Sequence, residues 1–419
     1  MRQFSGANRP LPVTLWHVTA NDSRTHAPEF TTPDGLLWHV RDVQPVEDAS
    51  APSFVFAGDK QIADEFNLDF LGHTDFVDPP PISVIGFSDQ KHDKKLYLAA
   101  LRGPAPADAA LGENGFPLVS SDAALARLGE PEDVLGAAWV GMPILDNRHL
   151  AFTSVGVRKS AEHQGIGTAL AEIAENIAKA AGRTTLTSWS GHQIAAEDDT
   201  DVLIPPTGVG RVPLDRFARF AQRRGFQLEQ AERHSQLDLP VDSAKLAEFR
   251  DAAQARATDY EVITWVGRTP DEYISDMVEL HRRMSIDIPL AGLDFQEEVW
   301  DEDRVRHDDD RTEKASRVPF WAVARHIPSG QLVAYTAVNT NLEPDYAFQN
   351  DTLVHGDHRG HRLGMLVKAA NLQELAAQRP ALKRIHTWNA GENSYMLSIN
   401  VALGFRPVSV EGAWQKKLD

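Results

Sequence analysis

A basic loop ahead of a predicted helix is the part of this sequence best suited to chemistry. Its residues are His358, Arg359, Gly360, His361, Arg362, Leu363 and Gly364. The first amides of a helix lack backbone partners and carry partial positive charge, and glycine lets a phosphate approach them closely. Arginine adds forked bonds to phosphate oxygens. The loop therefore predicts a diphosphate-binding site, and a solvated basic turn is the alternative.

The rest of the chain is acidic, which makes this basic cluster informative. The 419 residues carry a formal charge of −18, so a polyanion such as nucleic acid would be repelled overall. No stretch approaches the ~20 apolar residues of a membrane helix. The absence of cysteine excludes disulfides, a thiol nucleophile and cysteine-ligated metal. We expect a cytoplasmic protein that binds neither nucleic acid nor membrane, as a monomer or homodimer.

The glycine loop occurs twice in the chain. Residues 149–190 and 346–390 both read as strand, polar loop, glycine-containing helix start, helix and strand, with Gly167 aligned to Gly364. A Gly-Phe pair follows each copy, at Gly225 and at Gly404. A repeat this long predicts duplicated domains rather than a solenoid. We predict an N-terminal domain at 1–239 and a C-terminal domain at 240–419.

Apolar runs and turn signals predict the elements of each copy. Strands are expected at 95–101, 134–142, 150–157, 184–189, 320–325, 332–338, 348–354 and 384–388. Helices are expected at 166–181, 213–224, 363–378 and 392–401. The charged segment 297–314 is interpreted as a solvated helix or loop. The pattern predicts an α/β (α+β) fold whose mixed, mostly antiparallel sheets carry helices on both faces.

These motifs resemble the GNAT acetyltransferase superfamily. Its signature is a strand ending in Val, a loop of the form R/Q-x-x-G-x-G/A at a helix start, a strand, a helix and a Gly-Phe turn. The resemblance covers the chain twice, at 157–181 and 354–378, and TWNAGENSYMLSINVALGF is similar to the family's last segment. The whole is similar to actinobacterial tandem-GNAT proteins, the group that includes mycothiol synthase.

The resemblance implies acetyl-CoA as donor and a small-molecule amine as acceptor. The diphosphate of acetyl-CoA would lie on the loop amides, and its pantetheine arm between two splayed parallel strands, near the backbone of Leu353 and Val354. Asn389 and Asn393 match positions that often contact this arm. Turn and helix-cap duty is the alternative for both asparagines.

The two copies depart from the family pattern in different ways. Glu162 replaces the leading Arg/Gln of the first loop, which weakens the case for CoA there. Arg362 replaces the first glycine of the second loop. The usual tyrosine acid is missing, because Ala221 and Asn400 stand at its positions. We therefore expect the C-terminal copy to be the catalyst and the N-terminal copy a degenerate scaffold.

Candidate groups for proton transfer lie around the second copy. Asp351 is a carboxylate within an apolar strand, which suits a base or an ion-paired group. Tyr395 is the candidate acid. Direct transfer from acetyl-CoA to an amine is the leading hypothesis, and a non-catalytic CoA-binding module is the alternative. No cluster shows metal-ligand spacing, and the acceptor is not readable from the sequence.

Overall fold

The structure is a computed structural model that describes residues 28–47, 49–127, 129–341 and 345–419. The first half contains β1 (Glu29–Thr31), β2 (Leu37–Gln44), α1 (Phe54–Leu71), α2 (Pro80–Ser88), β3 (Asp93–Arg102), β4 (Leu118–Ser120), β5 (Val134–Pro143), β6 (Leu150–Val157), α3 (Ile166–Ala180), β7 (Thr185–His192), β8 (Val202–Leu203), β9 (Val212–Pro213), α4 (Arg216–Arg223) and β10 (Gln227–Asp238).

The second half repeats the same succession of strands and helices. It contains α5 (Ser243–Gln254), β11 (Tyr260–Val266), α6 (Ile274–Asp287), α7 (Glu302–Lys314), β12 (Arg317–His326), β13 (Leu332–Asn341), β14 (Tyr346–Val354), α8 (Leu363–Gln378), β15 (Arg384–Ala390), α9 (Ser394–Leu403) and β16 (Arg406–Lys417). Short 3₁₀ turns lie at Pro131–Asp133, Lys159–Ala161, Asp271–Tyr273 and Gly356–His358.

One sheet of 14 strands runs through both halves. Its order is β1-β2-β3-β5-β6-β7-β16-β10-β15-β14-β13-β12-β11, with β4 paired to β2. Most neighbours are antiparallel, and β6 with β7 and β14 with β15 are parallel pairs. The predicted α/β class with a mixed, mostly antiparallel sheet is thereby confirmed.

Helices cover both faces of the sheet in each half. In the first half α1 packs on the face that carries Tyr97 and Ala99, while α3 packs on the face of Leu98 and Ala100. In the second half α6 contacts Tyr335 and α8 contacts the opposite face of β13. In the described part of the chain, no helix is both long and apolar enough to cross a membrane.

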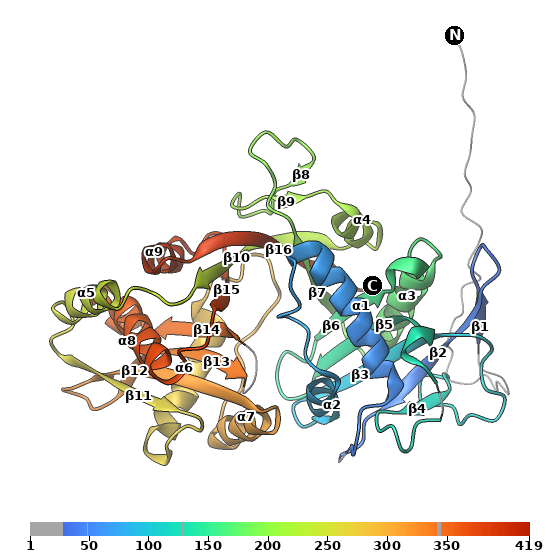
Figure 1. Cartoon of the computed structure of the whole chain (residues 1–419), viewed down its shortest axis with the longest axis horizontal. Coiled ribbons are helices and arrows are strands. Elements are labelled where there is room, and N and C mark those ends of the chain that lie inside the picture. Colours follow the sequence, from blue (N-terminus) through green and yellow to red (C-terminus); the bar gives the residue numbers. More distant parts are fainter. Residues whose placement is uncertain (1–27, 48, 128, 342–344) are drawn as a thin grey trace, which may run out of the picture.

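The last strands of the two halves are exchanged. β10 ends the first half but pairs with β15 of the second, and β16 ends the second half but pairs with β7 of the first. β10 and β16 also pair with each other, so the C-terminus returns to the first half (Figure 1). Neither sheet edge at the junction is left open, and each half depends on a strand of the other.

Local signals place most elements accurately. β6 and α8 begin and end where the sequence predicted. α4 begins at Arg216, three residues later than predicted, because the Asp215 carboxylate caps it by accepting bonds from the amides of Phe217 and Ala218.

A substitution of Trp414, on the exchanged strand β16, tests whether the two halves share a core. Its side chain is 1% exposed and packs with Val212, Ala218, Leu228 and Ala231. We expect Trp414→Ala to lower the free energy of unfolding by about 3–5 kcal/mol, as for other buried tryptophans, measured by urea unfolding followed by circular dichroism. Val401→Ala, at an exposed position of α9, is the control. A loss below about 1 kcal/mol in W414A would contradict a shared core.

Candidate active site

A gap opens between the parallel strands β14 and β15. They pair only from Tyr346 with Arg384 to Phe348 with His386, and then separate. On its other edge, β14 carries a bulge, because Asn350 and Asp351 together lie opposite Ala337 of β13. A bulge turns side chains out of the regular alternation of a strand, and here it lies beside the gap.

The first half has a similar gap without the bulge. β6 and β7 also separate after three pairs, but the register between β5 and β6 is unbroken from Gly136 to Gly141. The gap is filled by aromatic rings. Phe295, from the α6–α7 loop, stacks on Phe152 with ring centroids 6.0 Å apart, and Trp189 lies 6.5 Å from Phe295. Phe295 and Trp189 also line the cavity at the second gap, so that cavity reaches the rings of the first.

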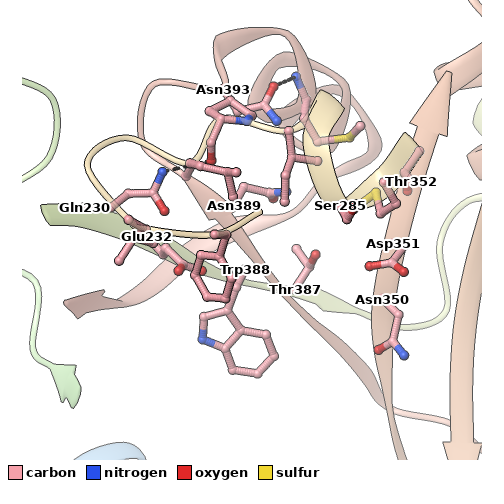
Figure 2. Close-up of a pocket in the computed structure, with 18 of the residues that line it drawn as sticks. Gln230, Glu232, Ser285, Asn350, Asp351, Thr352, Thr387, Trp388, Asn389 and Asn393 are labelled. Atoms are coloured by element: carbon pink, nitrogen blue, oxygen red, sulfur yellow. Dashed lines mark hydrogen bonds between the residues drawn. The ribbon is translucent and has the colours of Figure 1, made fainter. Parts of the chain in front are cut away.

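A cavity of about 480 Å³ lies at the second gap. Figure 2 shows side chains from β10, β14 and β15 around it. Its lining includes Trp189, Gln230, Glu232, Ser285, Phe295, Glu298, Gln349, Asn350, Asp351, Thr352, Lys368, Thr387, Trp388, Asn389 and Asn393. Two strands of the first half, β7 and β10, thus supply part of the wall of a site in the second.

Asp351 lies in this cavity, on the face of β14 that α6 covers. The Tyr335 hydroxyl donates to its Oδ2 at 3.2 Å. Burial raises the pKa of Asp351 above its ordinary value, and the nearby Glu298 carboxylate adds to the rise, while the bond from Tyr335 partly offsets it. A carboxylate with a raised pKa is suited to accept a proton.

Lys368 is a functional candidate that sequence reasoning missed. It is 1% exposed, lines the cavity, and its Nζ donates to Thr352 Oγ1 at 3.4 Å on the opposite face of β14 from Asp351. Burial lowers the pKa of Lys368 to about 7. The sequence did contain a signal of this burial. Lys368 lies four residues after Gly364 and four before Leu372, and residues four apart share one face of a helix, which in α8 is the buried face.

The predicted asparagines both reach the cavity wall. Asn389 Oδ1 accepts from Asn400 Nδ2 at 2.7 Å. Asn393 caps α9, because its Oδ1 accepts from the Met396 amide at 3.2 Å. Tyr395 is 56% exposed and lies beside Gly364, outside the cavity lining, so its role as the acid stays a prediction.

The loop before α8 has the geometry expected of an anion site. Arg362 takes the left-handed conformation, with φ 59°, at the N-cap of α8, as Gly165 does at α3 with φ 87°. Gly364 is constrained by packing, because a Cβ there would lie 3.1 Å from Ile399 Cδ1. Leu363 is buried, whereas Gly360 and His361 are exposed at the surface.

The basic side chains divide into two pairs. His358 Nδ1 bonds the Tyr260 hydroxyl at 2.9 Å, and His361 packs against the same ring. Arg359 and Arg362 are exposed at the loop surface. Arg359 Nε donates to the carbonyl of Val354, and its guanidinium lies 3.7 Å from Asp287. Leu353 and Val354 pair with Tyr335 and Ala334 along β13.

The equivalent loop of the first half is crowded by acids. Glu162 is paired with Arg216 at 2.7 Å. Glu65 of α1 accepts from the Lys159 amide, and Asp69 pairs with the Lys159 ammonium. Three carboxylates around this loop would oppose a diphosphate.

A buried polar chain joins the two halves behind the site. Asp75 accepts from Arg384, and its Oδ2 lies 2.9 Å from His386 Nε2; His386 in turn contacts His234 at 3.1 Å. Burial alone would raise the pKa of Asp75, but the bonds from His386 and Arg384 lower it to about 2. His73, Asp75 and His386 are grouped closely enough for a metal ion, yet Arg384 already supplies the countercharge.

Solved structures share this architecture. A tandem GNAT protein from the clavulanic acid biosynthesis pathway, solved without AcCoA, is 22% identical and matches with a TM-score of 0.62 over 91% of this chain and 98% of its own. The chain has a tandem GNAT fold. A GCN5-related glucosamine N-acetyltransferase region of a fungal multi-domain GH3 β-N-acetylglucosaminidase is 13% identical, with a TM-score of 0.53 over 90% of this chain and 38% of its own.

The sequence comparisons add nothing to the structural ones. Neither a scan of protein-family models nor a search of curated proteins finds a match. The GNAT resemblance seen in the sequence is confirmed at the level of the fold, and the resemblance to mycothiol synthase stays a prediction.

Lys368 makes the stability depend on pH. Its pKa is about 7 in the fold and near 10.5 when unfolded, so the unfolded chain binds the extra proton between these values and stability rises with pH. We expect Lys368 to contribute a gain of about 2 kcal/mol between pH 7 and pH 9, measured as the difference between the pH slopes of the parent and Lys368→Met, because Glu411, with its pKa raised to about 8, contributes in the opposite sense in both proteins. Urea unfolding at the two pH values measures it. An equal pH slope in K368M and the parent would show that Lys368 is charged in the folded protein, against the expectation.

Proposed function

We propose that this protein is an acetyl-CoA-dependent N-acetyltransferase whose C-terminal half transfers an acetyl group directly to a small-molecule amine. The observation that carries the proposal is the bulged, half-open strand β14, which lies between the cavity and the loop before α8. The first half completes the cavity wall through Trp189, Gln230 and Glu232. The domain division at residue 239 belongs to the same proposal.

The residues around the gap fit the donor. Exposed Arg359 and Arg362 and the first amides of α8 suit its diphosphate. Past Phe348, β14 has no strand partner on the β15 side, so its backbone groups that do not bond to β13 are turned toward the gap, where the Gln349 carbonyl accepts from Thr387 and the Val354 carbonyl from Arg359. Asn389 and Asn393 add amide groups there. When bound, acetyl-CoA supplies an acetyl group activated as a thioester.

Asp351 and Lys368 would handle the protons. A charged amine loses one proton to solvent before attack, and Asp351 accepts the second as the N–C bond forms and the C–S bond of the thioester breaks. A proton from charged Lys368 goes to the departing sulfur. Asp351 then gives up its proton and Lys368 regains one, so each turnover releases one proton to solvent. Lys368, with its pKa near 7, is a suitable donor to the sulfur in place of the missing tyrosine.

The two arginines test donor binding. We expect Arg359→Gln and Arg362→Asn each to weaken CoA binding roughly tenfold, because each removes a charge-assisted bond to phosphate. Asparagine is chosen because it tolerates the left-handed conformation. Calorimetry with CoA measures the affinity, and Glu162→Gln, at the aligned position of the first loop, is the control. Unchanged affinity in both variants, or loss in the control alone, would place CoA elsewhere.

Asp351 tests the chemistry. We expect Asp351→Asn to lower kcat about 10²- to 10⁴-fold, as for loss of a general base, while the Kd for CoA stays within about twofold of the parent value. Release of the CoA thiol in the presence of an amine panel measures turnover. Asp357→Asn, in the exposed loop three residues beyond β14, is the control. CoA binding without turnover of any amine would favour a CoA-binding module instead.

A further inference from the structure

Three glutamates gather near the first-half end of the cavity: Glu232 lines it, and Glu392 and Glu411 lie beside Glu232. Glu232 of β10 and Glu411 of β16 are register partners, and residues directly opposite on antiparallel strands project from the same face. Glu392, just ahead of α9, is close enough to raise the pKa of Glu232 further, although burial is the larger cause. Burial and Glu232 together raise the pKa of Glu411 to about 8.

No cation neutralises this group in the described part of the chain. None of the three glutamates has an ion-pair partner, and Glu392 Oε2 is buried without a hydrogen bond. The partners present are neutral: Trp189 Nε1 donates to Glu232 at 3.2 Å, and Gln230 Nε2 donates to Glu392 at 2.7 Å. The three glutamates are half-buried, and a nearby positive charge stabilises carboxylates that are partly removed from water, so this end of the cavity suits a cationic ligand.

The geometry favours an organic cation over a metal ion. In the described residues the one group with metal-ligand spacing is His73, Asp75 and His386, which excludes the three glutamates. Trp189 and Trp388 line the cavity beside Glu232. Aromatic walls of this kind contact the carbon chain of an ammonium ligand and attract its charge.

Asp351 forms a second acidic end of the same cavity. Figure 2 shows Glu232 on β10 and Asp351 on β14, with β15 residues Thr387 and Trp388 between them. β10 and β14 are each neighbours of β15, so their backbones lie about 10 Å apart where the three strands pair, and farther apart at Asp351, where β14 has left β15. The two ends therefore suit two positive charges separated by a short carbon chain.

We propose that the acceptor is an aliphatic diamine or polyamine, held by Glu232 with Glu392 and Glu411 at one ammonium while the other amine faces Asp351. This rests on the proposed function and names its substrate class. The lining contains one lysine and no arginine, so a ligand carrying a carboxylate gains no countercharge near Glu232. The first half thereby determines specificity, and the second half performs the transfer.

Cadaverine and pentylamine, which have the same carbon chain, test the proposal. With saturating acetyl-CoA we expect kcat/KM to favour cadaverine by about 10- to 100-fold, the value of one charge-assisted contact. Glu232→Gln is expected to remove most of this preference while changing turnover of pentylamine less than about threefold. Asp238→Asn, on the exposed end of β10, is the matched control. Calorimetry of cadaverine with CoA-bound protein gives a readout without turnover.

The outcomes separate the two proposals. Equal use of cadaverine and pentylamine, an equal loss for both in E232Q, or no heat of cadaverine binding to the CoA complex would overturn the diamine assignment and leave acetyl transfer standing. Failure to bind CoA would instead overturn the proposed function. Retained pentylamine turnover in E232Q shows that the variant folds, and Glu411→Gln provides a second variant, expected to alter the cadaverine preference in the same assay.

Discussion

The pairing of β10 with β16 at the centre of the sheet is the contact on which the rest of the structure depends. Because the two terminal strands are exchanged, β10 lies against β15 and brings Gln230 and Glu232 to a cavity of the other half. The first half is therefore part of the second-half site whether or not it holds a ligand of its own. Its last strand completes the sheet of its partner, and its polar residues complete the wall of the cavity.

Beside the additional β1, β4, β8 and β9 of the first half and α5 of the second, the two copies differ by one residue in the strand at the gap. Two residues of β14, Asn350 and Asp351, lie opposite Ala337, whereas the aligned pairing of β6 with β5 is regular. The extra residue turns Asp351 into the gap beside Tyr335. In the first half the regular strand leaves Phe152 at the gap, where Phe295 stacks on it. The bulge thus gives β14 a carboxylate at its gap, where β6 presents an aromatic ring.

Local sequence signals were sufficient for the elements around the two glycine loops, whereas α1, α2, α6, β2, β11 and β16 were not predicted. β6 and α8 were bounded correctly because turn residues and helical spacing act over a few positions, and Asp351 was noticeable as a carboxylate within an apolar strand. The strand exchange could not be read, since β10 and β16 pair across nearly 180 residues and nothing local encodes a partner that distant. Lys368 was missed because a lysine in a helix is usually solvated.

Burial is the largest cause of the shifted pKa values of the two groups proposed to handle protons. Removing solvent disfavours whichever form is charged, so it raises the pKa of Asp351 and lowers that of Lys368. The alternation of β14 then places them on opposite sides of the gap, with Asp351 toward α6 and Thr352 toward Lys368 of α8. An amine arriving on one side and a thiol leaving on the other would each meet a group whose pKa is already shifted in the direction that favours the proposed proton transfer. No tyrosine at position 400 is needed for this division, because the sheet itself separates base from acid.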